Sequence, residues 1–286
     1  MVLMLTSLTL LLFGLAAGSF VNALVYRLHE QNKVKSKKLK VKKTFQDLSI
    51  VHGRSMCPNC KHTLAWYDLI PVVSWLMLGG KCRYCKKPIS PQYPLVELTM
   101  ALVFVVSYVF WPENDFNDGQ WLLLATWLIS SVGLLALALY DLKWQLLPNR
   151  IIYPTLAVSA LGTLAYTIFF SDNIGKSLLL WAMSLAVASG IFYLLFIISN
   201  GKWIGFGDVR LGLVTGTLLA KPQYSLLMIF IASVLGTLVA LPDLLRRKKT
   251  LASRLPFGPF LITATFIVVL FGPSILNYYK NFMGLN

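Results

Sequence analysis

Eight apolar runs, most of them close to 20 residues long, alternate with polar segments along this chain of 286 residues. A helix needs roughly 20 consecutive apolar residues to cross a bilayer, and 57% of the residues are hydrophobic while only 13% are charged. The pattern therefore predicts an all-α polytopic membrane protein with about eight transmembrane helices. The runs lie near residues 3–26, 94–111, 121–140, 151–170, 177–199, 204–220, 225–245 and 257–279.

The net charge of +15 comes from basic residues that gather in a few segments between the apolar runs. Loops rich in Lys and Arg stay in the cytoplasm, and only Lys176, Lys221 and Lys280 fall on the opposite side in this arrangement. We therefore predict a multi-pass protein of the cytoplasmic membrane, with both termini outside. Because this topology accounts for the positive charge, we expect no nucleic-acid partner.

The first apolar run has a second interpretation, a cleavable secretory signal, because residues 16–19 are small. A signal peptide begins with basic residues, however, whereas here the lysines follow the run. We therefore expect a retained helix, and we divide the chain into a first helix at 1–26, a cytoplasmic segment at 27–93 and a seven-helix membrane domain at 94–286. Within the second, the basic arm at 33–43 is expected to lie against anionic lipid.

Two CxxC pairs in the cytoplasmic segment, separated by 21 residues, have the spacing of a zinc ribbon. Each short loop can present two thiolates to one tetrahedral ion. Disulfides are the alternative, but the segment is assigned to the reducing side of the membrane. The sequence thus predicts a small zinc-ribbon-like insertion between the first two helices, and four ligands make the Zn²⁺ structural. The predicted ligands are Cys57, Cys60, Cys82 and Cys85.

Two aspartates stand out because charged side chains are costly within apolar helices. Asp141 ends the third run, and Asp208 opens the sixth beside Gly205 and Gly207. Either one alone could be a polar helix end in contact with interfacial water. Both are predicted at the same cytoplasmic depth, so we predict that they form an aspartyl protease pair, in which one carboxyl keeps a proton while the other activates water.

Helix polarity suggests how the pair divides its work. Asp141 lies near the C-terminal end of its helix, where the helix dipole disfavours negative charge, and Asp208 lies near an N-terminal end, which favours it. We predict that Asp141 is the protonated partner and Asp208 the base. A proton-coupled transporter is the alternative from another class, although its carboxylates are expected near the bilayer midplane. A catalytically idle scaffold organised by the zinc ribbon is a third reading.

Several motifs, in order along the chain, resemble those of the bifunctional type IV prepilin peptidases, also called leader peptidase/N-methyltransferases. Asp141 with the trailing Pro148 and Asn149 resembles one catalytic aspartate motif, and residues 205–208 resemble the GxGD motif that carries the other. The remaining segments that resemble the family are 18–22 with Arg27, 54–60, 66–71, 74–76, 80–85, 89–90, 93–97 and 256–260.

The resemblance implies an enzyme of the bacterial inner membrane that cuts the basic leader from prepilins or pseudopilins after a glycine. It would then methylate the new N-terminal residue with S-adenosylmethionine. Methyl transfer rests on the resemblance alone, because no dinucleotide-type GxGxxG motif follows a predicted strand; a peptidase without methyl transfer is the alternative. The chain departs from the family pattern in its long basic arm and in Arg210, where the family often has Lys.

Three polar residues of the first two helices are expected to be structural. Ser19 and Asn22 are predicted to form hydrogen bonds between helices. Glu97 is predicted to pair with Arg27 or Lys81.

Overall fold

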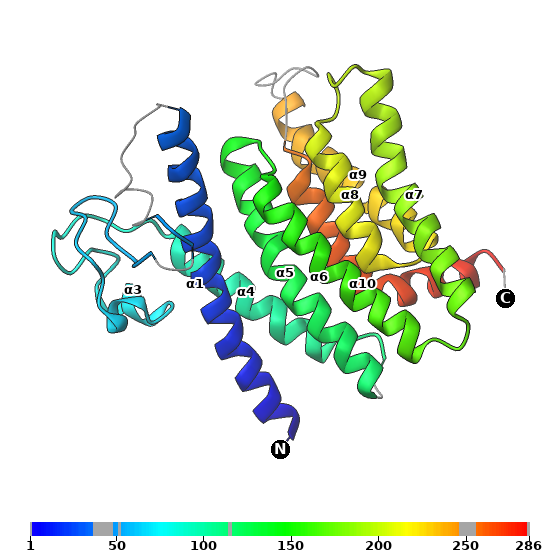
Figure 1. Cartoon of the computed structure of the whole chain (residues 1–286), viewed down its shortest axis with the longest axis horizontal. Helices are drawn as coiled ribbons and strands as arrows, with labels where there is room; N and C mark the ends of the chain where they lie inside the picture. Colours follow the sequence, from blue (N-terminus) through cyan, green and yellow to red (C-terminus); the bar gives the residue numbers. More distant parts are fainter. Residues whose placement is uncertain (1, 37–47, 51–52, 114–115, 246–255, 285–286) are drawn as a thin grey trace. The chain divides into compact units, whose positions relative to one another are not determined.

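The computed structural model describes residues 2–36, 48–50, 53–113, 116–245 and 256–284, and these residues are almost entirely helical (Figure 1). The only β pairing within them consists of two isolated bridges, Met56 with Thr63 and Lys81 with Pro88. The helical elements are α1 (Val2–Ser36), η1 (Trp66–Leu69), α3 (Val73–Met77), α4 (Gln92–Val109), α5 (Asp118–Trp144), α6 (Asn149–Phe170), α7 (Ile174–Ile198), α8 (Phe206–Leu219), α9 (Pro222–Leu245) and α10 (Gly258–Phe282).

The eight predicted apolar runs correspond to α1 and to α4 through α10, which confirms the all-α membrane fold. Seven of the described helices are long and apolar enough to cross a membrane. The run predicted at 204–220 forms α8, which has 14 residues and is about 21 Å long, shorter than the roughly 30 Å hydrocarbon core. Gly205 starts this helix, and Ala220 ends it in a left-handed conformation.

The chain forms two compact units, residues 1–109 and residues 110–286. These are units of packing, so the predicted functional boundaries at 26/27 and 93/94 stay predictions. Most of the predicted basic arm at 33–43 and the basic cluster at 246–249 lie outside the described residues.

Glycines bring α1 and α4 into close contact in the first unit. A Cβ added to Gly14 would lie 2.6 Å from the Cα of Ala101, and one added to Gly18 would lie 2.5 Å from the Cα of Glu97. This GxxxG spacing is typical of membrane helix pairs, in which close backbone approach maximises van der Waals contact. The predicted interhelical role of Asn22 is confirmed, because its Nδ2 donates to a backbone carbonyl of α4 at 3.0 Å.

The carboxylate of Glu97 has a partner other than those predicted. Its Oε2 accepts a hydrogen bond of 2.8 Å from the backbone N–H of Val72. Arg27 instead donates to three backbone carbonyls in residues 49–53, at 2.9–3.1 Å. The prediction that Glu97 pairs with Arg27 or Lys81 was wrong. The Glu97 carboxylate and the Arg27 guanidinium each form hydrogen bonds with backbone groups instead.

The second unit repeats the close packing. In α8, a Cβ on Gly212 would lie 2.6 Å from the carbonyl oxygen of Ala188 in α7, and one on Gly216 would lie 2.9 Å from the Cβ of Ala188. The hydroxyl of Ser184 in α7 also donates to the carbonyl of Gly216 at 2.8 Å. Short α8 is thereby fixed along one face of α7, and its N-terminal turn, which carries Asp208, is positioned with it.

Candidate functional site

The four predicted metal ligands lie on two loops with the same backbone conformation. In each loop the carbonyl of the first cysteine accepts a 2.9 Å hydrogen bond from the residue four positions later. These two residues, Lys61 and Lys86, both have φ of 59°. Each loop is closed by one of the two β-bridges. The repeated geometry aims the thiols of both loops at one point.

The four sulfur atoms form a cluster that could hold a metal ion. All four Sγ atoms lie within 4.8 Å of one another, the Sγ atoms of Cys57 and Cys85 are 3.9 Å apart, and none is in a disulfide. A tetrahedral Zn²⁺ with bonds of about 2.3 Å needs sulfurs separated by about 3.8 Å, so the donor set fits. Burial raises the pKa of Cys57, but hydrogen bonds, chiefly from the backbone of Cys60 and Asn59, outweigh burial and bring it to about 7.

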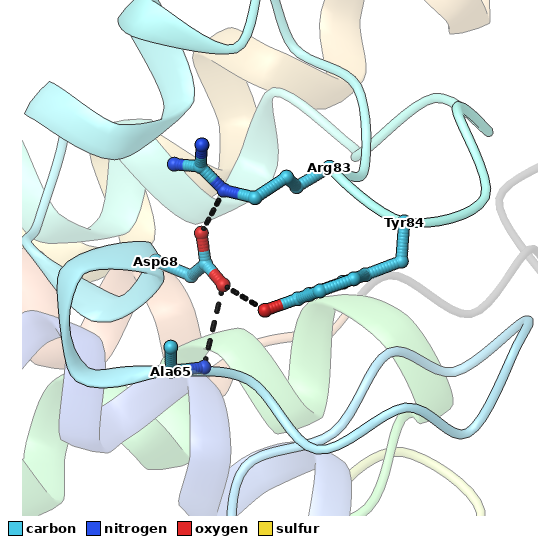
Figure 2. A network of polar contacts seen from close by, with 4 residues as sticks. All are labelled: Ala65, Asp68, Arg83 and Tyr84. Carbon is cyan, nitrogen blue, oxygen red and sulfur yellow. Dashed lines mark hydrogen bonds and ion pairs between the residues drawn. The ribbon is translucent and has the colours of Figure 1, made fainter.

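A polar network fixes the second loop to the segment between the two pairs (Figure 2). One carboxylate oxygen of Asp68 accepts from Nε of Arg83 at 2.7 Å, and the other accepts from the Tyr84 hydroxyl at 3.0 Å and the Ala65 N–H at 3.3 Å. Burial raises the pKa of Asp68, but these hydrogen bonds outweigh it and hold the pKa below its ordinary value. The carboxylate therefore stays ionised and fully bonded.

The second unit brings the two candidate aspartates to one end of its helices. Asp141 lies in the last turn of α5 and is 5% exposed, and Asp208 lies in the first turn of α8 and is half-buried. Figure 1 shows the C-terminal end of α5 and the N-terminal ends of α8 and α10 at the same end of this unit. Both carboxyl groups therefore lie at the same end of the second unit.

The first residue of α10 holds Asp141 directly. The backbone N–H of Gly258 donates to Oδ2 of Asp141 at 3.1 Å, and a Cβ at this position would lie only 2.6 Å from the same oxygen. Only glycine therefore allows this amide to approach the carboxylate without displacing it. The sequence indicated residues 256–260 as the start of an apolar run and as a family motif. It did not indicate that they contact Asp141, because the donor is a backbone amide, which nearly every residue type has.

The loop after α5 packs against both motifs. A Cβ on Gly207 would lie 3.1 Å from the Cβ of Leu147, and Leu147 also borders Gly258. Arg210 in α8 donates a hydrogen bond to Asn149 at the start of α6, and its guanidinium lies 4.7 Å from the ring centroid of Phe206. The predicted aspartate motif and the predicted GxGD motif are thus joined by two contacts, Leu147 with Gly207 and Arg210 with Asn149.

Two carboxyl groups at one end of a helical unit, one of them buried, offer the chemistry of an acid–base pair. Where two carboxyl groups lie at close range, both cannot ionise cheaply, and such a pair tends to keep one proton. One carboxyl can then donate a proton while the other accepts one from water.

Two family models match successive parts of the chain. The bacterial peptidase A24 N-terminal domain matches residues 12–111, and the type IV leader peptidase family matches residues 128–241. The chain is 32% identical to the prepilin leader peptidase/N-methyltransferase of Pseudomonas aeruginosa over 281 residues, which cover 96% of this chain and 93% of the relative.

Other relatives with the same name give similar values. The protein of Legionella pneumophila is 32% identical over 280 residues, covering 94% of this chain and 92% of the relative. The protein of Stutzerimonas stutzeri is 29% identical over 282 residues, covering 96% and 94%. No solved structure matches the chain.

We expect Cys82→Ser to lose bound metal, because three thiolates and a hydroxyl bind Zn²⁺ much more weakly than four thiolates do. Metal per chain is measured by elemental mass spectrometry on the purified full-length protein. Ser55→Ala, a change of similar size in the same segment but outside the cluster, should keep its metal. Full metal content in Cys82→Ser would contradict the four-cysteine site.

Proposed function

This chain belongs to the bacterial type IV prepilin leader peptidase family, and we propose that it cleaves the leader of prepilin-type substrates with Asp141 and Asp208 as its catalytic pair. The observation that carries the assignment of these residues is their convergence. Two carboxyl groups from different helices lie at the same end of the second unit, and a backbone amide from a third helix holds one of them.

In the proposed reaction, the ionised carboxylate takes a proton from water as the water oxygen attacks the carbonyl carbon of the scissile peptide bond. The protonated carboxyl donates to the carbonyl oxygen, which develops negative charge. As the tetrahedral intermediate collapses, the C–N bond breaks and the carboxyl that took the water proton gives it to the departing amine of the mature substrate. The other carboxylate takes back a proton from the intermediate, and the leader is released with a new carboxyl group. Because one proton is shared, the apparent pKa values belong to the pair rather than to either residue.

The division of roles between the aspartates stays a prediction, and the structure adds a contribution that the sequence did not reveal. The predicted protonation of Asp141 considered only the C-terminal end of α5. The Gly258 amide and the N-terminal end of α10 act on the same carboxylate in the opposite direction. Asp208 also sits at a helix N-terminus, so helix polarity alone no longer separates the two residues.

The four cysteines would hold a structural Zn²⁺, because all four coordination positions are taken by protein. Such an ion would stabilise the loops at 57–60 and 82–85. We further propose that S-adenosylmethionine serves as methyl donor for the cleaved substrate, since the relatives are named as N-methyltransferases. The chain is placed in the inner membrane as a multi-pass protein, with the cysteine segment and the aspartate pair assigned to the cytoplasmic side by the distribution of basic residues.

Because the chain belongs to this family, the hypothesis of a proton-coupled transporter has no support. For the same reason we propose prepilin-type proteins as its substrates. A helical substrate could lie among the membrane helices while its leader extends to the end of the second unit. This arrangement explains why the carboxyl groups lie at helix ends.

We expect Asp141→Asn and Asp208→Asn each to lower prepilin cleavage by about 100-fold or more, the typical contribution of general acid–base catalysis. Each purified variant is reconstituted in liposomes with a prepilin, and the product N-terminus is read by mass spectrometry. Near wild-type cleavage by either variant would remove the aspartyl mechanism. Wild-type product that never gains a methyl group in the presence of S-adenosylmethionine would leave the peptidase-only alternative.

We expect Gly258→Ala to lower cleavage by roughly 10- to 100-fold, the loss that follows from removing one hydrogen bond to a charged group. The added methyl would overlap the Asp141 carboxylate. The matched control is Gly190→Ala in α7, where an added Cβ meets no atom within 4 Å. Equal rates for the two variants would show that the Gly258 amide does not position Asp141.

A further inference from the structure

An exposed apolar surface covers η1 and α3 in the first unit. Trp66 is 77% exposed, Leu76 63% and Met77 81%. These values match those of apolar side chains on the membrane helix α1, such as Phe13 at 68%. We call this surface the apolar patch, and its seven members are Trp66, Tyr67, Leu69, Ile70, Val73, Leu76 and Met77.

The one acidic residue of segment 66–77 is enclosed by its partners. The side chain of Asp68 is only 3% exposed, and it pairs with Arg83 across 2.7 Å. Figure 2 shows its carboxylate enclosed by Arg83, Tyr84 and the Ala65 amide. The network therefore removes the single negative charge from a surface that otherwise presents apolar and aromatic side chains.

A hydrogen bond fixes the patch at the depth of the apolar part of α1. The Val72 N–H, directly before α3, is bound by Glu97, and Glu97 packs against Gly18. Gly18 precedes Arg27, the first charged residue of the chain, by nine residues, or about 13 Å along a helix. In Figure 1, α3 lies level with the middle of α1 rather than beyond its C-terminal end.

The backbone at this point is strained. Val72 has φ of 62° and ψ of −50°, and the Val73 N–H reaches back to the Pro71 carbonyl at 2.6 Å. This is a classic γ-turn, which is rare and unfavourable for a β-branched residue. Such a conformation persists only where its surroundings enforce it, and here the buried carboxylate of Glu97 does so. This turn sets the direction in which α3 leaves the pair formed by α1 and α4.

We propose that the apolar patch is a membrane-surface anchor that enters the headgroup–acyl boundary of an anionic bilayer, beside the middle of α1 and the N-terminal end of α4. Aromatic side chains such as Trp66 and Tyr67 are favoured at this boundary. Basic side chains of the same segment would meet anionic headgroups. Apart from the enclosed Asp68, the charged residues within 53–93 are all basic and exposed, namely Arg54, Lys61, Lys81, Arg83, Lys86 and Lys87.

The anchor is tested with the full-length protein in liposomes of phosphatidylcholine and phosphatidylglycerol. A fluorescent amino acid is incorporated at Met77, or at Asn59 as the control. Asn59 is also exposed but lies in the first cysteine loop, outside the patch. Quenching is measured with a lipid that carries a nitroxide at the fifth acyl carbon, and separately with iodide in the water phase.

The anchor predicts that the nitroxide lipid quenches the probe at Met77 several-fold more than the probe at Asn59, and that iodide gives the reverse order. Equal lipid quenching at the two positions, or strong iodide quenching at Met77, would overturn it, because the patch would then face water. Protection of Met77 from both quenchers would also overturn it, since a protein would then cover the patch. None of these outcomes depends on peptidase activity, so they are independent of the proposed function.

Discussion

The hydrogen bond from the Gly258 amide to the Asp141 carboxylate is the contact on which the candidate catalytic end of the second unit depends. A carboxylate that is 5% exposed at the end of an apolar helix must be satisfied by protein or lose its charge. At the start of α10, the Gly258 N–H binds this carboxylate, and the helix dipole favours negative charge there. Asp141 therefore ties the position of α10 to that of α5, and with it the loop containing Leu147 that packs against the GxGD segment.

Close helix packing makes such contacts possible. Interior glycines let α1 approach α4 and let α8 approach α7, so that backbone atoms lie where side chains would otherwise keep the helices apart. Both units satisfy a buried acidic side chain in the same way. A buried acid, Asp141 or Glu97, is satisfied by a backbone amide from a neighbouring element rather than by a basic side chain. An amide donor neutralises less charge than a lysine but needs no long side chain inside the apolar region.

Residue type and spacing were enough to predict the cysteine cluster and to single out the two aspartates, because both depend on side chains that are rare or costly in such a chain. The number of apolar runs likewise predicted the helices. The shortness of α8 did not follow from hydropathy, since it depends on the backbone at Gly205 and Ala220. The partners of Asp141 and Glu97 were missed for a related reason: their donors are the amides of Gly258 and Val72, and every residue but proline has one.

The pH dependence of cleavage tests the central claim, that two interacting carboxyl groups share one proton during the reaction. For the liposome-reconstituted enzyme acting on a prepilin, we predict that kcat/KM plotted against pH is bell-shaped. The rate should fall at low pH, where both carboxyl groups are protonated, and at high pH, where both are ionised. A profile with no loss of rate on the alkaline side, in enzyme that stays folded across the range, would contradict the shared proton.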